Sequence, residues 1–435
     1  MRPRVLTASL GRWVDPAEAY AALCRHASAA FWLDSGPTAS EGVSYLGVAA
    51  SVTSRFDGPV LDWLHEQKRE VDVSHAPHGF RLGWVGWLGY ELRRETMGVP
   101  VSRESRYPDA AWMLVTECLA FDHASREVTL LALDDIAGFH DRVSAALTTA
   151  PQLPAETAAA PSTVEWAYSD ADYLAMIASC QESIRNGDAY QLCLTTEARV
   201  EVSPDPFATY LALRTTSPTH HGALLIAAGV AILSATPEQF LTVSPEGVVE
   251  TKPIKGTRRR GATDATDRAL RAELESSDKE RAENLMIVDL MRNDIGRISR
   301  VGSVTVPSLL EVESYAHVHQ LVSTVRGQLA EGLTSIDAIE ACFPAGSMTG
   351  APKLSATQIL DSLEQRARGI YSGVFGYVGL DGAVDLAMVI RSIIIDEHGS
   401  TVGTGGGITA LSIPSEELDE ARLKAAALLR VLGAA

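Results

Sequence analysis

Residues 222–245, GALLIAAGVAILSATPEQFLTVSP, form a run rich in Ala, Leu, Ile and Val that is punctuated by Gly and Pro. Apolar segments of this length between turn-forming residues are typical of strands that are buried on both faces. The run therefore predicts two or three strands inside a large sheet. An apolar fraction of 46% over 435 residues is sufficient for such a core.

Composition divides the chain into three regions. Strand-like runs alternate with turns in residues 1–143, whereas residues 144–164 are rich in Ala, Pro and Thr and are typical of a linker or a long surface loop. In residues 165–435, helical and strand-like patterns are interleaved. We therefore predict a mixed α/β or α+β fold with a large sheet core. Pattern alone leaves open whether residues 1–143 form a separate domain or lend strands to a shared sheet.

The charge balance restricts the partners of the protein. A formal charge of −18 argues against a nucleic-acid partner or an anionic membrane, because either requires a basic surface. A small anionic substrate remains possible if positive charge is concentrated in one pocket. The five cysteines are scattered without a CxxC pair, and the N-terminus has no apolar run typical of a signal peptide. These features predict a soluble, cytoplasmic protein.

The segment TKPIKGTRRR, residues 251–260, places Lys255 in what we expect to be an apolar turn beside three arginines. Desolvation and nearby cations both favour the neutral amine of a lysine, which is its nucleophilic form. The alternative is an ordinary solvated lysine, since lysines are rarely buried.

Two predicted helices begin with paired glutamates. The first starts at Ser277, whose spacing from Glu280 is that of a capping box, and Glu283 lies on the same face as Glu280. The second starts at Pro414 and Ser415, and places Glu417, Glu420 and Lys424 on one face. Such glutamates are most simply explained by helix-dipole compensation and a surface ion pair. They are also the oxygen ligands that Mg²⁺ requires together with an anionic substrate.

Four further features indicate an anion-binding site. The glycine-rich segments 342–356 and 402–410 offer free amides, the second as a loop that follows a strand, although both could be simple turns. Arg391 interrupts an apolar strand-like run, so we expect it to be buried and to require an acidic partner or a substrate carboxylate. Glu238 follows buried strands and a proline, and partial burial would make it a general acid; its alternative is a solvated turn residue.

Taken in order, these segments resemble the chorismate-utilising enzymes, which include anthranilate synthase component I, aminodeoxychorismate synthase component I, and the isochorismate and salicylate synthases. The resemblance covers about residues 165–435. The matching stretches are NGDAYQLCLT, ATPEQF, KPIKGTRRRG, DKERAENLMIVDLMRNDIGR, HQLVSTVRG, FPAGSMTGAPK, RGIYSGVFGYV, VIRS, GTGGGI and EELDEARLKA. The segments GWLGYE and WLDS resemble N-terminal parts of the same family.

The resemblance implies a sandwich of two large β-sheets flanked by helices, with the active site in a cleft. It implies Mg²⁺ held by Glu283 and Glu420, with support from Glu280 and Glu417. It also implies Glu238 as the general acid at the C4 hydroxyl of chorismate. The residues that would bind the substrate are Gln191, Thr349, Gly350, Tyr371, Arg391, Gly405, Gly406, Gly407 and Lys424.

The presence of Lys255 distinguishes between two branches of this family. The motif PIKGT resembles the corresponding motif of aminodeoxychorismate synthases. In anthranilate synthases the corresponding motif has Ala in place of the lysine. The resemblance implies that the Lys255 amine attacks C2 of chorismate and that ammonia then enters at C4, giving 4-amino-4-deoxychorismate for para-aminobenzoate and folate biosynthesis. The alternatives are an anthranilate synthase component I, which releases pyruvate, and a non-catalytic subunit that keeps the fold.

Several positions depart from family patterns. Gln191 stands where the water-adding isochorismate and salicylate synthases have a basic lysine, so that branch is not expected. The position that is often His before Leu-Val-Ser is Gln320, with His319 one residue earlier. WLDS resembles the segment that holds tryptophan in relatives, but SPTHHGALL has no aromatic residue after its proline, and tryptophan binding is not expected.

The source of ammonia is expected to be another protein. A glutaminase requires an activated cysteine in a glycine-flanked turn, and none of the five cysteines lies between glycines. We therefore expect a separate glutamine amidotransferase subunit, for which free ammonium can substitute.

Overall fold

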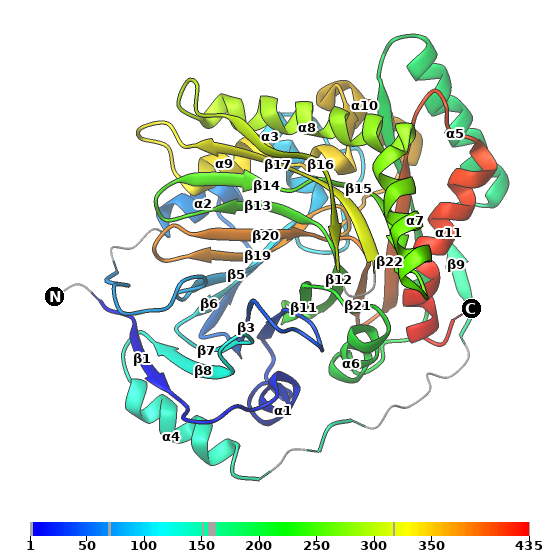
Figure 1. The fold of residues 1–435 in the computed structure, drawn as a ribbon. Coiled ribbons are helices and arrows are strands. Elements are labelled where there is room, and N and C mark those ends of the chain that lie inside the picture. The colour runs from blue at the N-terminus through cyan, green and yellow to red at the C-terminus, as the bar shows by residue number, and fades with distance from the viewer. Residues whose placement is uncertain (1–2, 68–70, 150–151, 155–161, 316–317, 435) are drawn as a thin grey trace.

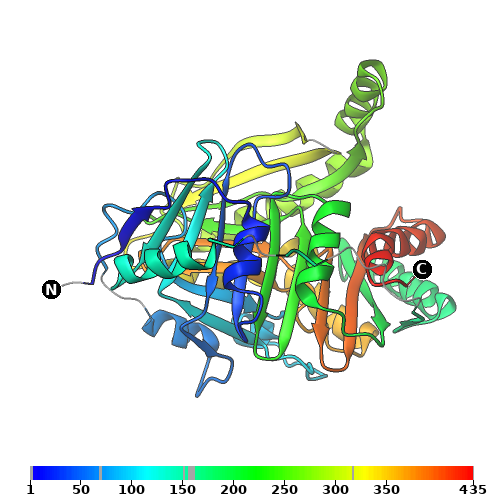
Figure 2. The same cartoon turned by 90° about the horizontal axis from the view of Figure 1, so that it is seen from below.

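The computed structural model describes residues 3–67, 71–149, 152–154, 162–315 and 318–434. Within these residues, two large, mostly antiparallel sheets pack together, and helices cover their outer faces (Figures 1 and 2). The predicted mixed α/β sandwich is therefore confirmed.

The larger sheet contains twelve strands within the described residues. Its order is β1-β8-β7-β3-β2-β11-β12-β21-β22-β10-β18, and β9 pairs with the end of β10. The strands are β1 Leu6–Ser9, β2 Ala30–Asp34, β3 Val43–Val48, β7 Glu117–Asp122, β8 Glu127–Ala132, β9 Val164–Trp166, β10 Gln191–Val200, β11 His221–Ala227, β12 Val230–Thr236, β18 Gly350–Ala351, β21 Ser392–Asp396 and β22 Gly399–Ile408.

The second sheet has ten strands in the described part of the chain. Its order is β15-β17-β14-β13-β20-β19-β5-β6-β4, and β16 pairs with β17. The strands are β4 Ser51–Thr53, β5 Gly83–Leu88, β6 Ala110–Val115, β13 Gln239–Val243, β14 Val248–Thr251, β15 Ile254–Arg259, β16 Thr305–Ser314, β17 Val318–Gln328, β19 Val374–Gly379 and β20 Val384–Met388.

The helices pack on the outer faces and at one end of the sandwich (Figure 1). They are α1 Pro16–Leu23, α2 Val60–Glu66, α3 Arg93–Met97, α4 Ile136–Ala146, α5 Asp170–Arg185, α6 Pro206–Thr216, α7 Asp264–Ser276, α8 Asp278–Ile298, α9 Ser335–Cys342, α10 Lys353–Glu364 and α11 Pro414–Val431, with short 3₁₀ turns at Tyr90–Leu92 and Gly346–Met348. Within the described residues, every helix is too short or too polar to cross a lipid bilayer.

The alternation of side chains in β5 explains why the sheets have two buried faces. Val85 and Trp87 point into the core between the sheets, whereas Trp84 and Leu88 point outward into the core beneath α2 and α9. Because successive side chains of a strand face opposite sides, an apolar run such as GWVGWL has both faces covered.

The run that predicts buried strands forms β11, β12 and β13, which confirms that prediction. The structure adds that β11 and β12 belong to the larger sheet, whereas β13 belongs to the second. The chain therefore crosses between sheets at Pro237 and Glu238.

A second crossing lies beside the first. β20 in the second sheet ends at Met388, and β21 in the larger sheet begins at Ser392. The Met388 amide donates to the Glu238 carbonyl (3.0 Å), and the Ala235 amide donates to the Arg391 carbonyl (3.1 Å). These two crossings place Glu238 and Arg391 at the same end of the sandwich.

Residues 1–143 supply strands to both sheets, from β1 through β8. Of the predicted linker 144–164, the first residues complete α4 and residue 164 begins β9. Residues 150–151 and 155–161 of that linker lie outside the described residues.

Candidate active site

A cavity of about 590 Å³ opens where the two crossings meet β15, β22, α8 and α11. Glu238 and Arg391 come from the crossings, Lys255 from β15, and the glutamates from the first turns of the two helices. Five more of the predicted site residues join them. The predicted site residues that line the cavity are Glu238, Lys255, Glu280, Glu283, Tyr371, Arg391, Gly405, Gly406, Gly407, Glu417, Glu420 and Lys424.

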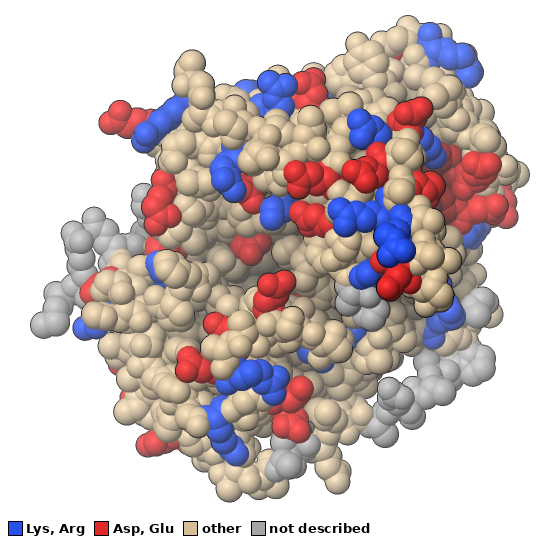
Figure 3. All heavy atoms as spheres, viewed as in Figure 1, with Lys and Arg blue, Asp and Glu red and all other residues tan. Residues whose placement is uncertain are grey.

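Charged side chains of both signs gather on the side of the molecule where α7 and α11 lie (Figure 3). The helices that carry the cavity's carboxylates begin as the sequence predicts. Ser277 is the N-cap of α8, and its hydroxyl accepts from the Glu280 amide (3.5 Å). α11 begins at Pro414 in its first turn, where a proline costs no hydrogen bond.

Glu238 is buried in the wall of the cavity, with 9% of its surface exposed. Burial raises the pKa of its carboxyl group, while the charge of Lys255, a hydrogen bond with Ser347 and the charge of Lys424 oppose that shift. A carboxyl group with a raised pKa is suited to hold and deliver a proton.

Lys255 lies in strand β15 and is half-buried, so the predicted turn is wrong. The bulge in the pairing of β15 with β17, between Ile254 and Thr257, turns this part of the strand toward the cavity. The charges that act on this ammonium group are carboxylates: its positive charge lowers the pKa values of Glu238 and Glu283.

Two of the three neighbouring arginines are paired with carboxylates. Arg258 binds Glu273 through two hydrogen bonds (2.6 and 2.9 Å) and reaches Glu280 (3.4 Å). Arg260 forms a bidentate pair with Asp267 (2.8 Å for both bonds). The charge of these two arginines is thus compensated by α7 and α8, whereas Arg259 lines the cavity together with Lys255.

Glu283 on α8 lies near two other carboxylates, one on the same helix and one on α11. Burial raises the pKa of Glu283, and the charges of Glu280 and Glu417 act in the same direction, against Lys255 and Lys279. Such mutual repulsion favours a bound proton or a cation at this position.

On α11, the carboxylates are held by lysines and a serine. Glu420 pairs with Lys424 (2.7 Å), and Lys424 also donates to the Gly405 carbonyl (2.9 Å). Burial would raise the pKa of Glu420, but the charges of Lys424 and other nearby lysines lower it overall. Glu417 accepts from Ser412 (2.7 Å) and lies 3.7 Å from Lys279.

The four glutamates that are predicted to hold Mg²⁺ line the cavity, but they do not converge on one point. All four glutamates line one cavity and are hard oxygen donors, as Mg²⁺ requires. Within the described residues, however, no three His, Cys, Asp or Glu side chains come close enough together to hold a metal ion.

Arg391 differs from the buried, paired arginine that its sequence context predicts. It is exposed to the cleft and has a φ of 51°, a left-handed conformation that is uncommon for a residue with a side chain. In the part of the chain that the structure describes, its guanidinium group has no hydrogen bond or ion pair with the protein. Desolvation in the cleft lowers its pKa, opposed by Tyr371 and Glu420. An unpaired guanidinium on a strained crossing is suited to bind a carboxylate.

The glycine-rich segment 402–410 lies largely within strand β22, so the predicted loop after a strand is wrong there. β10 pairs along its length, whereas β21 pairs with the Gly399–Val402 end. The edge of Gly403–Gly407 away from β10 therefore borders the cavity and can offer its backbone groups to a ligand. Gly403 is required because a Cβ would lie 2.1 Å from the Tyr371 ring.

Three predicted substrate-binding residues are not among the described residues that line the cavity. Gln191 is 1% exposed and packs behind Gly407, and its Oε1 has no partner within the described chain. The Thr349 hydroxyl donates to the carbonyl oxygens of Ala345 (3.1 Å) and Gly346 (3.3 Å), and is turned away from the cavity by these bonds.

Gly350 is the third of these residues. It pairs with Leu192 in the larger sheet, and a Cβ there would lie 2.1 Å from the Gln191 carbonyl oxygen. Its φ of 141° and this close approach explain the glycine by backbone packing.

His319 is held outside the cavity. Its ring bonds to Ser314 through Nδ1 (2.8 Å) and to Asp267 through Nε2 (3.0 Å), whereas the next residue, Gln320, lines the cavity. The alternation of the strand therefore places Gln320, and not His319, beside the reacting groups.

A buried ionic network supports the back wall of the cavity. Arg368 bonds to Glu364 through two nitrogens (2.7 and 2.8 Å) and donates to the carbonyl oxygens of Met348 (2.7 Å) and Cys193 (2.9 Å). Since Met348 and Cys193 both line the cavity, Arg368 fixes the position of two segments of its wall.

Sequence reasoning missed Ser347, Lys279 and Arg368. Ser347 and Arg368 lie inside motifs that carry the family resemblance, and Lys279 directly precedes a predicted metal ligand. The motifs indicated that these segments belong to the site. Which side chain of each segment faces the cavity depends on the tertiary structure.

Comparison with known proteins follows this geometry. The family model described as chorismate binding enzyme matches residues 28–430. Aminodeoxychorismate synthases of Streptomyces pristinaespiralis and Streptomyces griseus are 40% and 42% identical over 96% and 100% of the chain. The chain spans 64% and 65% of the lengths of these two relatives.

A solved structure has the same architecture. Anthranilate synthase component I from Streptococcus pneumoniae superimposes with a TM-score of 0.77 and 28% identity, over 98% of this chain and 92% of that one.

Proposed function

Because the chain belongs to the chorismate-binding enzyme family, we propose that it converts chorismate and ammonia to 4-amino-4-deoxychorismate, the precursor of para-aminobenzoate. The observation that carries this proposal is the position of Lys255 in the wall of the same cavity as the buried acid Glu238. The names of the relatives that are 40% and 42% identical support the same reaction.

The substrate would be bound by the unpaired guanidinium group of Arg391 and by the open edge of strand β22. Chorismate carries two carboxylates, and the guanidinium of Arg391 together with the backbone of Gly405–Gly407 offers donors to one of them. Tyr371, whose pKa is raised by burial, keeps its phenolic proton as a further donor.

Mg²⁺ would be held by Glu283 and Glu420, with Glu280 and Glu417 in support, and when bound it would neutralise the other carboxylate of chorismate. Burial and the neighbouring carboxylates, which raise the pKa of Glu283, support this assignment. Lys279 and Lys424 neutralise Glu417 and Glu420 in part, and these ion pairs would have to yield for the carboxylates to converge.

The electrostatics of the cleft suggest how the reactive forms arise. The ammonium form of a lysine is not a nucleophile, and only a protonated carboxyl group can act as an acid. One proton passed from Lys255 to Glu238 produces the amine and the acid together. The amine then attacks C2, the two ring double bonds shift, and the C4 hydroxyl departs as water with the proton of Glu238. Ammonia bonds to C4, the electrons shift back, and the C2–N bond to Lys255 breaks.

Ammonia would come from a glutamine amidotransferase subunit, as we expected from the absence of a glycine-flanked cysteine. All five cysteines are buried, and burial raises the pKa of each thiol, which disfavours a thiolate nucleophile. Glutamate release from glutamine by this chain alone would contradict the need for such a subunit.

The first test is product analysis with chorismate, Mg²⁺ and ammonium, by mass spectrometry and a pyruvate assay. A product that keeps the enolpyruvyl group, with no pyruvate released, is expected. Anthranilate with pyruvate would favour the alternative, an anthranilate synthase component I, in keeping with the solved relative. No magnesium-dependent consumption of chorismate would favour a non-catalytic subunit.

The second test removes the proposed nucleophile. Lys255→Ala is expected to slow amination by roughly a thousandfold or more, because the covalent route is lost. Lys252→Ala is the matched control, since Lys252 lies in the same segment, pairs loosely with Glu250 (3.7 Å) and does not contribute to the cavity lining. Normal amination by Lys255→Ala would exclude the covalent role.

A further inference from the structure

A second cavity, which we call the distal pocket, lies at the far ends of elements that carry the cleft residues. It has a volume of about 310 Å³ and shares no lining residue with the cleft among the described residues. β13 begins beside Glu238 and ends at the distal pocket with Val243. α9 begins there with Ser335, and the segment that follows α9 reaches the cleft at Ser347.

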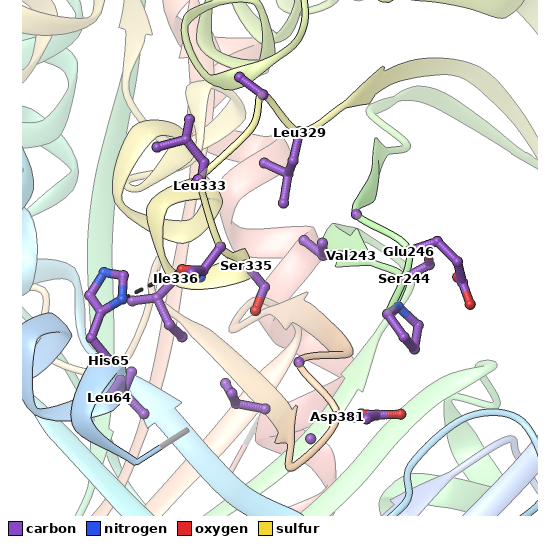
Figure 4. A pocket seen from close by; sticks show the side chains of 18 of the residues that line it. Leu64, His65, Val243, Ser244, Glu246, Leu329, Leu333, Ser335, Ile336 and Asp381 are labelled. Carbon is purple, nitrogen blue, oxygen red and sulfur yellow. Dashed lines mark hydrogen bonds between the residues drawn. The ribbon is translucent and has the colours of Figure 1, made fainter. Parts of the chain in front are cut away.

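The walls of the distal pocket are mostly apolar. Leu64 and Ile336 lie on one side, Val243 on the other, and Leu329 and Leu333 lie above them (Figure 4). The indole of Trp84 also contributes to the lining. A concave apolar surface of this size matches sites for small organic molecules rather than for ions.

Two polar groups of residues that line the distal pocket have no hydrogen-bond partner within the described residues, the Trp84 Nε1 and the Ser335 hydroxyl. Ser335 is 7% exposed, and Figure 4 shows its hydroxyl pointing into the space between the apolar walls. Within the described residues, this hydroxyl makes no hydrogen bond to the protein. Because this hydroxyl faces the pocket and not the protein, it is free to bond to water or to an atom of a ligand.

The charged residues around the pocket include both signs, so they favour no net charge on a ligand. Arg300 and Glu331, which are opposite in sign, both contribute to the lining. Asp337 caps the start of α9 by accepting from the Thr334 amide (2.7 Å), and lies 3.9 Å from His65. The positive end of the helix is therefore already compensated. Asp381 is paired with Arg81 (3.3 Å), while Glu246 is exposed and points away from the apolar walls (Figure 4).

From these observations we propose that the distal pocket is a second binding site, for a small neutral aromatic molecule that carries a hydrogen-bond acceptor. The ring packs between the apolar walls, and the acceptor receives the proton of the Ser335 hydroxyl. Nine non-hydrogen atoms, as in benzamide, fit the volume and correspond to a Kd of about 1 mM or lower.

Benzamide is the probe, and binding to the full chain is followed by ligand-observed NMR. Ser335→Ala is expected to weaken binding about fivefold, the effect of one lost hydrogen bond. Leu333→Ala, which trims a 37% exposed side chain at the wall, is expected to weaken it about threefold. Neither variant is expected to change chorismate turnover, because neither residue lines the cleft.

Competition separates the two cavities. Saturating chorismate is expected to leave benzamide bound, whereas displacement would place the probe in the cleft and overturn the proposal. The proposal also fails if benzamide does not bind at 10 mM concentration, roughly ten times the expected Kd, or if both variants bind it like the parent protein. Tighter binding of benzoate than of benzamide would overturn the assignment of a neutral ligand. A failure of any of these tests leaves the reaction proposed for the cleft untouched.

Discussion

The cleft and the network behind its wall use charge in opposite ways. Arg368 and Glu364 are 2% and 3% exposed, and each is bound by several well-placed hydrogen bonds. Glu364 additionally accepts from the amide and hydroxyl of Thr195 (2.9 and 3.0 Å). Arg391, in contrast, is open to the cleft and has no protein partner within the described residues.

The difference follows from desolvation. A charge that is removed from water is tolerated only when hydrogen bonds and an opposite charge compensate it, and the network meets that condition. At Arg391 the cleft leaves compensation to a ligand, so this charge destabilises the empty site and strengthens binding of an anion. Removing a charge should therefore reduce stability in the network and reduce activity in the cleft.

Glu238→Gln tests the cleft with the largest expected effect. Loss of the proposed general acid is expected to lower kcat by about 10²–10⁴, with little change in unfolding free energy. The parent enzyme should lose activity below the raised pKa of Glu238, because a protonated Glu238 cannot accept the proton of Lys255. That acid limb should disappear from the pH profile of the variant, and its survival would assign the limb to another group.

Arg368→Met tests the network. Removing one partner of a buried pair is expected to cost about 3–5 kcal/mol of unfolding free energy, measured by urea denaturation. Arg326→Met is the matched control, since Arg326 binds Glu250 (2.6 and 2.8 Å) with half of its own side chain exposed, and about 1 kcal/mol or less is expected. Equal losses of unfolding free energy in the two variants would show that the buried pair contributes no more to stability than the exposed pair.

Arg391→Met sharpens the contrast between the two regions. Loss of a charge-assisted hydrogen bond to substrate corresponds to about 1.5–3 kcal/mol, or a rise in KM of roughly ten- to hundredfold. The unfolding free energy should stay the same or increase, because an unpaired charge and its desolvation are removed. A destabilised variant with unchanged KM would place Arg391 among the structural arginines.

Asp385→Asn probes a third case, an uncompensated carboxyl group between the sheets. Burial raises the pKa of Asp385 to about 6, and no hydrogen bond with another described residue offsets it. A folded-state pKa above the unfolded value of 3.8 means that stability falls as pH rises from about 4 to 6. The variant should be about 1–2 kcal/mol more stable than the parent at pH 8 and equal to it near pH 4. A constant difference at both pH values would exclude titration of Asp385 as the cause.

Local sequence determined much of the fold. The helix signals at Ser277 and Pro414 are confirmed, because capping and the fixed φ of proline act within one turn. The apolar run of residues 222–245 is confirmed as three strands, since burial on both faces imposes that composition.

The partners of the charged side chains in the site could not be predicted from local sequence. Two of the arginines near Lys255 in sequence, Arg258 and Arg260, are compensated by Glu273, Glu280 and Asp267 from α7 and α8. Neighbours along a strand point to alternate faces, so the partners of a charge cannot be deduced from the residues beside it in the sequence. For the same reason, His319 and Gln320 have different surroundings.

The sequence by itself determined many of the elements, the family resemblance and twelve of the residues that line the cleft, because these depend on local pattern and on motifs in register. Only the tertiary structure decided that β13 and β21 lie in different sheets from the strands before them. Those crossings bring Glu238 and Arg391 to one end of the sandwich, and the partners of each charge are set there by segments far apart in the chain. Pairing between strands and desolvation are non-local, and for this reason they required the folded molecule.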